Sequence, residues 1–181
     1  MALLTLAEAK AQLNIETSAD DAELLAYIDA LTSVIEQHVG PVETRQVTET
    51  IQGRSPRICL THIPAVALVS VTPAIPAGSP LDLGGLLLDA PTGIVHHRTG
   101  TFAGTLWIAV YTAGRSAIPP TINLAARLLL QHLWRTQNGS ARGGGGADDY
   151  AVTEPIPGFG YAVPNRVLEL LEPFKLPPGV A

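Results

Sequence analysis

The chain has 181 residues and a net charge of −5, and 46% of its residues are apolar while only 15% are charged. This composition excludes a wholly disordered protein, and the negative charge argues against a protein whose main task is to grip nucleic-acid phosphates. The charge is unevenly distributed, with −7 over residues 1–43, +5 over 44–142 and −3 over 143–181. Acidic ends and a basic middle suit head-to-tail or stacked assembly, although chance clustering of solvated charges gives the same pattern.

Two helices are predicted before residue 44. Thr5 and Glu8 have the spacing of a capping box, which predicts a helix over residues 6–13. A second capping signal at residues 18–21 opens a helix over residues 20–39, and Gly40 followed by Pro41 ends it. The apolar residues of this second helix recur at helical spacing: Leu24, Leu25, Ile28, Leu31, Ile35 and Val39.

Residues 44–114 have the texture of β structure. Short runs of β-branched and apolar residues alternate with Pro- and Gly-containing turns, which is typical of strands in a small antiparallel sheet or barrel. The predicted strands are 47–51, 58–60, 68–72, 86–88, 94–96 and 105–112. The order in which they pair cannot be read from the sequence. We therefore expect a β-rich insertion at 44–114 between helices.

The remainder of the chain is predicted to hold one long and one short helix. Residues 121–138 are helical by pattern and apolar on more than one face, which indicates a central helix or one packed against another subunit. The Gly- and Pro-rich stretch 143–162 is typical of a flexible linker, and a last short helix with a Pro-rich tail follows at 163–181. The expected fold class is α+β, mainly helical, with a core over 1–142 and a small antiparallel β region inserted in it.

No motif in the sequence predicts a metal or a phosphate site. The four glycines at 143–146 are followed by Asp148 and Asp149, whose carboxylates would repel a phosphate, so a flexible hinge is the better interpretation. Neighbouring residues of a strand point to opposite faces, so His96 and His97 cannot chelate one ion together. Cys59 and His62 lack the second pair of ligands that a tetrahedral zinc site needs.

Catalytic and membrane roles are not predicted either. Ser116 lies outside any nucleophile elbow, and Cys59, between two apolar residues, is expected to be a buried, inert thiol. With one cysteine in the chain no internal disulfide can form, which fits a reducing compartment. The N-terminus lacks the basic region of a signal peptide, and the apolar stretch 124–133 is too short to cross a bilayer and is interrupted by Arg127. We therefore predict a soluble protein with no catalytic, cofactor or metal site.

Four segments of the chain resemble the head–tail connector (adaptor) proteins of long-tailed bacteriophages. They are the start with its first two helices (4–40), the strand end and junction (110–120), the long helix (122–134), and the C-terminal element from Val163-Pro164 to Phe174. The resemblance covers both ends of the chain and the order of the elements. It implies a mainly helical connector fold, although the middle, residues 44–104, is longer and richer in strands than in the simplest members.

The resemblance implies a structural virion protein without enzymatic activity. Members form a ring, expected to be dodecameric, that joins the portal to the tail or to the next neck protein. The ring extends the DNA channel for genome retention and ejection. The expected partners are other copies of the chain, the portal protein, the next neck or tail protein, and double-stranded DNA passing without sequence-specific binding. The expected location is the virion neck, after assembly in the host cytoplasm.

Two groups of residues are predicted to make these contacts. The C-terminal element would dock on the portal through Val167, Leu168, Leu171 and Phe174. The long helix would contact neighbouring subunits through Leu130, Leu133 and Trp134. Two alternatives stay open: another ring-forming neck or tail protein, such as a stopper or tail terminator, and a small enzyme of unknown type.

Overall fold

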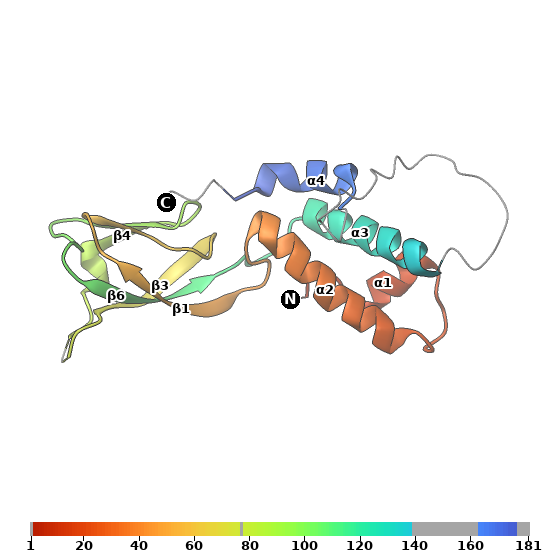
Figure 1. Ribbon diagram of the computed structural model, residues 1–181, viewed down its shortest axis with the longest axis horizontal. Helices are drawn as coiled ribbons and strands as arrows, with labels where there is room; N and C mark the ends of the chain where they lie inside the picture. The colour runs from red at the N-terminus through yellow and green to blue at the C-terminus, as the bar shows by residue number, and fades with distance from the viewer. Residues whose placement is uncertain (1, 77, 139–162, 177–181) are drawn as a thin grey trace. The chain divides into compact units, whose positions relative to one another are not determined.

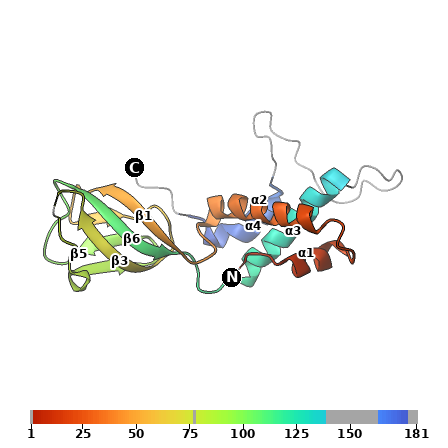
Figure 2. The same cartoon turned by 90° about the horizontal axis from the view of Figure 1, so that it is seen from below.

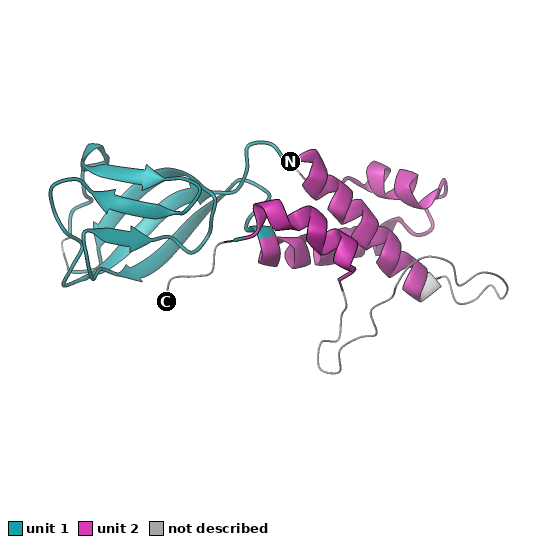
Figure 3. Cartoon of the chain, turned by 90° about the horizontal axis from the view of Figure 1, so that it is seen from above, with its two compact units in different colours: residues 1, 39–117, 176–181 teal, residues 2–38, 118–175 magenta. Residues whose placement is uncertain are grey.

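The computed structural model describes residues 2–76, 78–138 and 163–176, which divide into two compact units (Figure 3). The β unit contains residues 39–117 and 176, and the helical unit contains residues 2–38, 118–138 and 163–175. The helical unit is therefore assembled from segments on both sides of the β unit in the sequence. The predicted linker 143–162 lies outside the described residues.

The helical unit consists of four helices, and the helices predicted from the sequence are confirmed. Their bounds are Leu6–Leu13 for α1, Asp21–Val39 for α2, Pro120–Asn138 for α3 and Asn165–Leu171 for α4, with a short 3-10 helix, η2, at Glu172–Phe174. The capping box forms as expected: the backbone N–H of Glu8 donates to Thr5 Oγ1 at 3.2 Å, and the N–H of Thr5 donates to Glu8 Oε2 at 2.9 Å. Both hydrogen bonds satisfy amides that the first helical turn leaves without a partner.

Aliphatic side chains fill the core of the helical unit. Those from the two long helices, α2 and α3, that are fully buried include Leu24, Leu31, Ile35, Ile122, Leu129 and Leu130. Polar contacts then fix the helices in register: Arg127 on α3 pairs with Glu8 on α1 at 2.7 Å, and Lys10 pairs with Asp21 at 2.7 Å. Helix α4 lies along α3, as two perpendicular views show (Figures 1 and 2).

The β unit consists of two three-stranded antiparallel sheets. One has the order β1-β6-β3 and the other β2-β5-β4. The strand bounds are Arg45–Gln52 (β1), Arg57–Cys59 (β2), Ala65–Pro73 (β3), Leu86–Asp89 (β4), Ile94–His97 (β5) and Leu106–Ala113 (β6), and a 3-10 turn, η1, spans Leu83–Gly85. Strand β6 is central in its sheet, and its alternate residues are buried because one face of the strand packs on the core.

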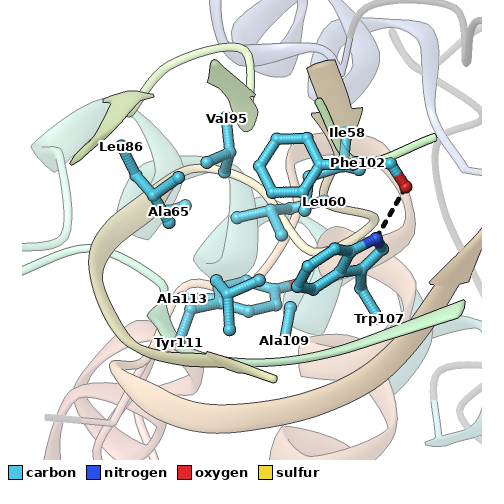
Figure 4. Close-up of a cluster of buried hydrophobic side chains, with 11 residues drawn as sticks. Ile58, Leu60, Ala65, Leu86, Val95, Phe102, Trp107, Ala109, Tyr111 and Ala113 are labelled. Atoms are coloured by element: carbon cyan, nitrogen blue, oxygen red, sulfur yellow. Dashed lines mark hydrogen bonds between the residues drawn. The ribbon is translucent and has the colours of Figure 1, made fainter. Parts of the chain in front are cut away.

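Three aromatic rings organise the core of the β unit (Figure 4). Phe102 packs edge-to-face on Trp107, with ring centroids 5.4 Å apart, and the indole N–H of Trp107 donates to the carbonyl of Phe102 at 2.7 Å. Tyr111 is fully buried beside them, and aliphatic side chains from both sheets complete the cluster. Gly53 is required here because a Cβ on it would lie 1.8 Å from the Phe102 carbonyl oxygen.

The segment that enters the β unit and the segment that leaves it are connected by hydrogen bonds. The guanidinium of Arg115, just after β6, donates to the carbonyl oxygens of Val39 at 2.9 Å and Pro41 at 3.1 Å. Gly114 precedes it with φ of +115°, a conformation that L side chains rarely adopt. These contacts close the insertion at its base, as a unit inserted into another fold requires.

The expectation of a mainly helical fold is wrong. The structure is a mixed α+β fold in which six strands form two sheets with their own core. The short predicted strands looked like an appendage because turns containing Pro and Gly separate them. Four of the strands are longer than predicted, and the largest extensions are in β1, which spans Arg45–Gln52, and β3, which spans Ala65–Pro73. There is therefore enough sheet surface to enclose a second core.

Candidate functional site

A groove between α3 and α4 is the best candidate for an interaction site in the helical unit. We call it the α3–α4 groove, and it has a volume of about 220 Å³. Its apolar lining comes from Leu128 on α3 and from Pro164 and Val167 at the start of α4. Because sites for drug-sized molecules usually measure about 300–1,000 Å³, this groove suits a few side chains of a protein partner better than a small molecule.

The polar lining of the α3–α4 groove combines the neutral side chains of Gln131 and Thr136 with basic or titratable ones. His132 and Arg135 reach it from successive turns of α3, and Arg166 reaches it from α4. Within the described part of the chain, neither Arg135 nor Arg166 pairs with a carboxylate. A partner segment that combines an apolar side chain with carboxylates would therefore gain both apolar burial and charge pairing.

The residues predicted to dock on the portal divide into two pairs. Val167 and Leu171 are 1% and 2% exposed, so they hold α4 in the helical unit. Leu168 and Phe174 are only half-buried and keep part of their surface accessible. The position of these four side chains does not test portal docking, which stays a prediction. In the conformation described, Leu168 and Phe174 are the pair that a partner could reach.

The residues predicted to contact neighbouring subunits are also divided. Leu130 is fully buried in the helical core, whereas Leu133 and Trp134 are half-buried. The ring of Trp134 packs edge-to-face on Tyr27 of α2, with centroids 5.8 Å apart, so it joins two helices of the same chain. A further contact of Trp134 with a neighbouring copy stays a prediction.

A polar cluster in the β unit brings together groups that could suggest catalysis. The backbone N–H and the hydroxyl of Thr61 both donate to the carboxylate of Glu49, and His62 Nδ1 lies 3.9 Å from that carboxylate. The buried hydroxyl of Tyr111 accepts a hydrogen bond from the backbone N–H of His62 at 3.0 Å, and burial raises the pKa of Tyr111 to about 12. These hydrogen bonds anchor the loop after β2 to β1 through Glu49 and to β6 through Tyr111.

The single cysteine is not the buried thiol that its apolar neighbours predict. Cys59 is exposed, so that expectation is wrong: inward Ile58 and outward Cys59 alternate along β2. Among the described residues, no three His, Cys, Asp or Glu side chains are grouped as metal ligands. No helix in the same part of the chain has the length and apolar run needed to cross a bilayer.

The α3–α4 groove was not found from the sequence. It forms where two helices from distant parts of the chain meet, and no local motif marks such a meeting. The sequence gives one related indication: residues 121–138 are apolar on more than one face, which predicts that another element or another subunit packs on this helix. The structure shows that α4 covers part of it and leaves the groove beside it.

Chains in solved structures of gene transfer agent particles share this fold. A chain in the neck of an empty particle, a structure computed with C6 symmetry, aligns with a TM-score of 0.69 at 19% identity, covering 98% of this chain and 92% of that one. A chain in the neck of a native particle, a structure computed with C12 symmetry, aligns with a TM-score of 0.64 at 18% identity, covering 97% of this chain and 90% of that one. At this identity the similarity shows a shared fold.

Comparison at the sequence level gives the family. No curated protein matches the chain. The family model described as "Head completion protein" matches residues 2–175, which include both compact units. This match confirms the resemblance to head–tail connector proteins. The chain belongs to the head completion protein family.

Proposed function

We propose that the protein is a non-catalytic structural component of the neck of a phage-like particle. The observation that carries the proposal is the family match over residues 2–175, which spans both units. The shared fold with neck chains of gene transfer agent particles supports it over nearly the whole length.

In this role the chain forms a ring of identical copies, which we propose to be dodecameric. The ring lies between the portal and the tail or the next neck protein, and it extends the channel through which DNA is retained and ejected. The C12 and C6 symmetries of the two neck structures are compatible with twelve copies. The net charge of −5 would limit adhesion of DNA to the channel wall if acidic residues line it.

The exposed parts of the C-terminal element are the proposed contact with the portal. Leu168 and Phe174 are available for it, while Val167 and Leu171 hold α4 in place. A deletion of residues 163–181 would therefore remove buried side chains and disturb the helical unit. Point variants at the accessible positions test docking without this complication.

The proposal is tested by co-purification of the full chain with the portal protein of the same particle, followed by mass measurement of the intact complex. We expect a stable complex with several copies of the chain per portal ring. The double variant Leu168→Ser with Phe174→Ser should lose portal binding, whereas Leu87→Ser, an exposed position in the β unit, should not. Absence of the chain from the necks of intact particles, or no binding to the portal, would contradict the proposal.

A further inference from the structure

We propose that neighbouring copies of the chain contact each other head to tail through their helical units. The exposed face of α2 in one copy lies in the α3–α4 groove of the next. This inference rests on the proposed ring and specifies how its subunits join. A ring of identical subunits needs a contact between two different surface patches of the same chain, because only such contacts propagate around a circle.

One of the two patches is the exposed face of α2, which we call the acidic face. At its edge Leu25 is 50% exposed, whereas the other leucines of the helix, Leu24 and Leu31, are fully buried. Asp29 lies one turn further along beside it, and Glu23 lies at the other edge of the face. Exposed alanines, Ala22 and Ala26, lie between them and let another surface approach the helix closely.

The carboxylates of the acidic face are available to a partner. No basic side chain of the described residues pairs with Glu23 or Asp29, whereas Asp21 in the same helix is already paired with Lys10. The face therefore offers a protruding apolar side chain flanked by unpaired negative charge. Charge of this kind steers a partner and sets its orientation more than it adds affinity.

The second patch, the α3–α4 groove, has the complementary properties. Leu128 and Val167 give it an apolar lining that suits a leucine side chain, and its volume of about 220 Å³ admits a few side chains. Arg135 and Arg166 are exposed and supply positive charge at its sides. An amphipathic helix in an apolar groove is a common mode of protein recognition.

A second copy of the chain is the occupant that these observations favour. The acidic face and the groove are opposite in charge, one protrudes where the other is hollow, and both belong to the same helical unit. Fully buried leucine adds about 1.5–3 kcal/mol, and a ring repeats the contact at every subunit. The acidic block of residues 1–43 contains α2, whereas the two arginines of the groove lie on α3 and α4.

Charge reversal in a mixture of two variants tests this contact. The first protein carries Glu23→Arg with Asp29→Arg, and the second carries Arg135→Glu with Arg166→Glu. Alone, each would set like charges against each other, and we expect each to assemble on the portal only at a concentration about tenfold or more above that of the wild type. Mixed in equal amounts, the two should assemble as well as the wild type, because every contact in an alternating ring then joins opposite charges.

Matched controls separate this effect from a general loss of charge or folding. Glu16→Arg and Arg98→Glu reverse exposed charges outside both patches and should leave assembly unchanged. The reversed residues are themselves exposed, so thermal unfolding of each protein should stay close to that of the wild type. Assembly is followed by mass measurement of complexes formed on the portal.

Crosslinking gives a second measurement that needs no portal. In a Cys59→Ser background, Ala26→Cys combined with Thr136→Cys should give a ladder of covalent multimers on oxidation at high protein concentration. Either cysteine alone should give no ladder, because head-to-tail contact brings together two different residues. Random collision would give dimers from the single variants as readily as from the double variant.

The outcomes separate this inference from the proposed function. If the wild type neither assembles nor binds the portal, the proposed function fails. If the wild type assembles but the charge-reversed proteins do so equally well, or if their mixture is no better than either alone, the head-to-tail contact is wrong while the neck role stands. Loss of portal binding without loss of contact between copies would show that the groove receives the portal, and loss of stability alone would show that the chain's own residues fill it. Both results overturn the inference.

Discussion

Each unit of the protein contains one of its two tryptophans, and the two have different environments. Trp107 is 7% exposed in the β unit, and both its ring and its N–H are engaged by Phe102. Trp134 is half-buried on α3, and its described ring contact is with Tyr27. The difference indicates that the β unit uses aromatic side chains to specify its interior, whereas the helical unit is held by an aliphatic interior and keeps an aromatic side chain near its surface.

The largest expected effect concerns the aromatic core of the β unit. Phe102→Ala removes a fully buried ring that packs on Trp107, and we expect it to lower the free energy of unfolding by about 3–5 kcal/mol. In a Trp134→Phe background, the fluorescence of Trp107 reports the β unit alone, and circular dichroism at the helical bands reports the other unit. Simultaneous loss of both signals would show that the two units unfold together and that their interiors are not independent.

Trp134→Ala should have a smaller effect on stability. It removes a half-buried ring and one edge-to-face contact, for which we expect about 1–2 kcal/mol. Trp134→Phe keeps an aromatic ring against Tyr27 and serves as the matched control. If Trp134 also contacts a neighbouring copy, Trp134→Ala will reduce assembly on the portal by more than its loss of stability explains. If the reduction in assembly matches the loss of stability, Trp134 acts only within its own chain.

The predicted helices agree with the structure because their signals are local. The capping box at Thr5 and Glu8 marks the start of α1, and the repeat from Leu24 to Val39 marks one face of α2. A helix closes its hydrogen bonds four residues away, so its pattern is contained in a short window. The same reasoning located the segment that became α4 from a few apolar residues after Pro164.

The sheets and the α3–α4 groove depend on residues far apart in the sequence. Strand β6 lies between β1 and β3, and Val47 pairs with Tyr111 across more than sixty residues. No local pattern carries that pairing, which explains why strand order was unreadable and why the β region was underestimated. The groove likewise needs Arg135 and Arg166 to meet across the segment that separates α3 from α4. The burial of Val167 and Leu171 cannot be predicted from the sequence either, because α4 packs on a helix that is distant in the chain.

The smallest expected effect concerns one hydroxyl group in the β core. Tyr111→Phe removes the acceptor of the His62 backbone N–H but keeps the ring, and we expect a loss of about 1 kcal/mol near neutral pH. The cost arises because the N–H loses its partner in a part-buried position. Urea unfolding of the two proteins under the same conditions measures it.

The pH dependence of that difference identifies its cause. Burial raises the pKa of Tyr111 from its ordinary value of 10.0 to about 12, so the folded protein keeps a neutral phenol that the unfolded chain ionises. The corresponding stability is fully present below pH 10 and is lost as the pH rises towards 12. The Tyr111→Phe variant has no phenol at this position and does not show this loss of stability. Burial also raises the pKa of Tyr27, but Tyr27 is present in both proteins. Subtracting one stability profile from the other therefore removes its contribution. The advantage of the wild type should therefore shrink above pH 10, and parallel profiles would show that the Tyr111 hydroxyl is solvated in the folded protein.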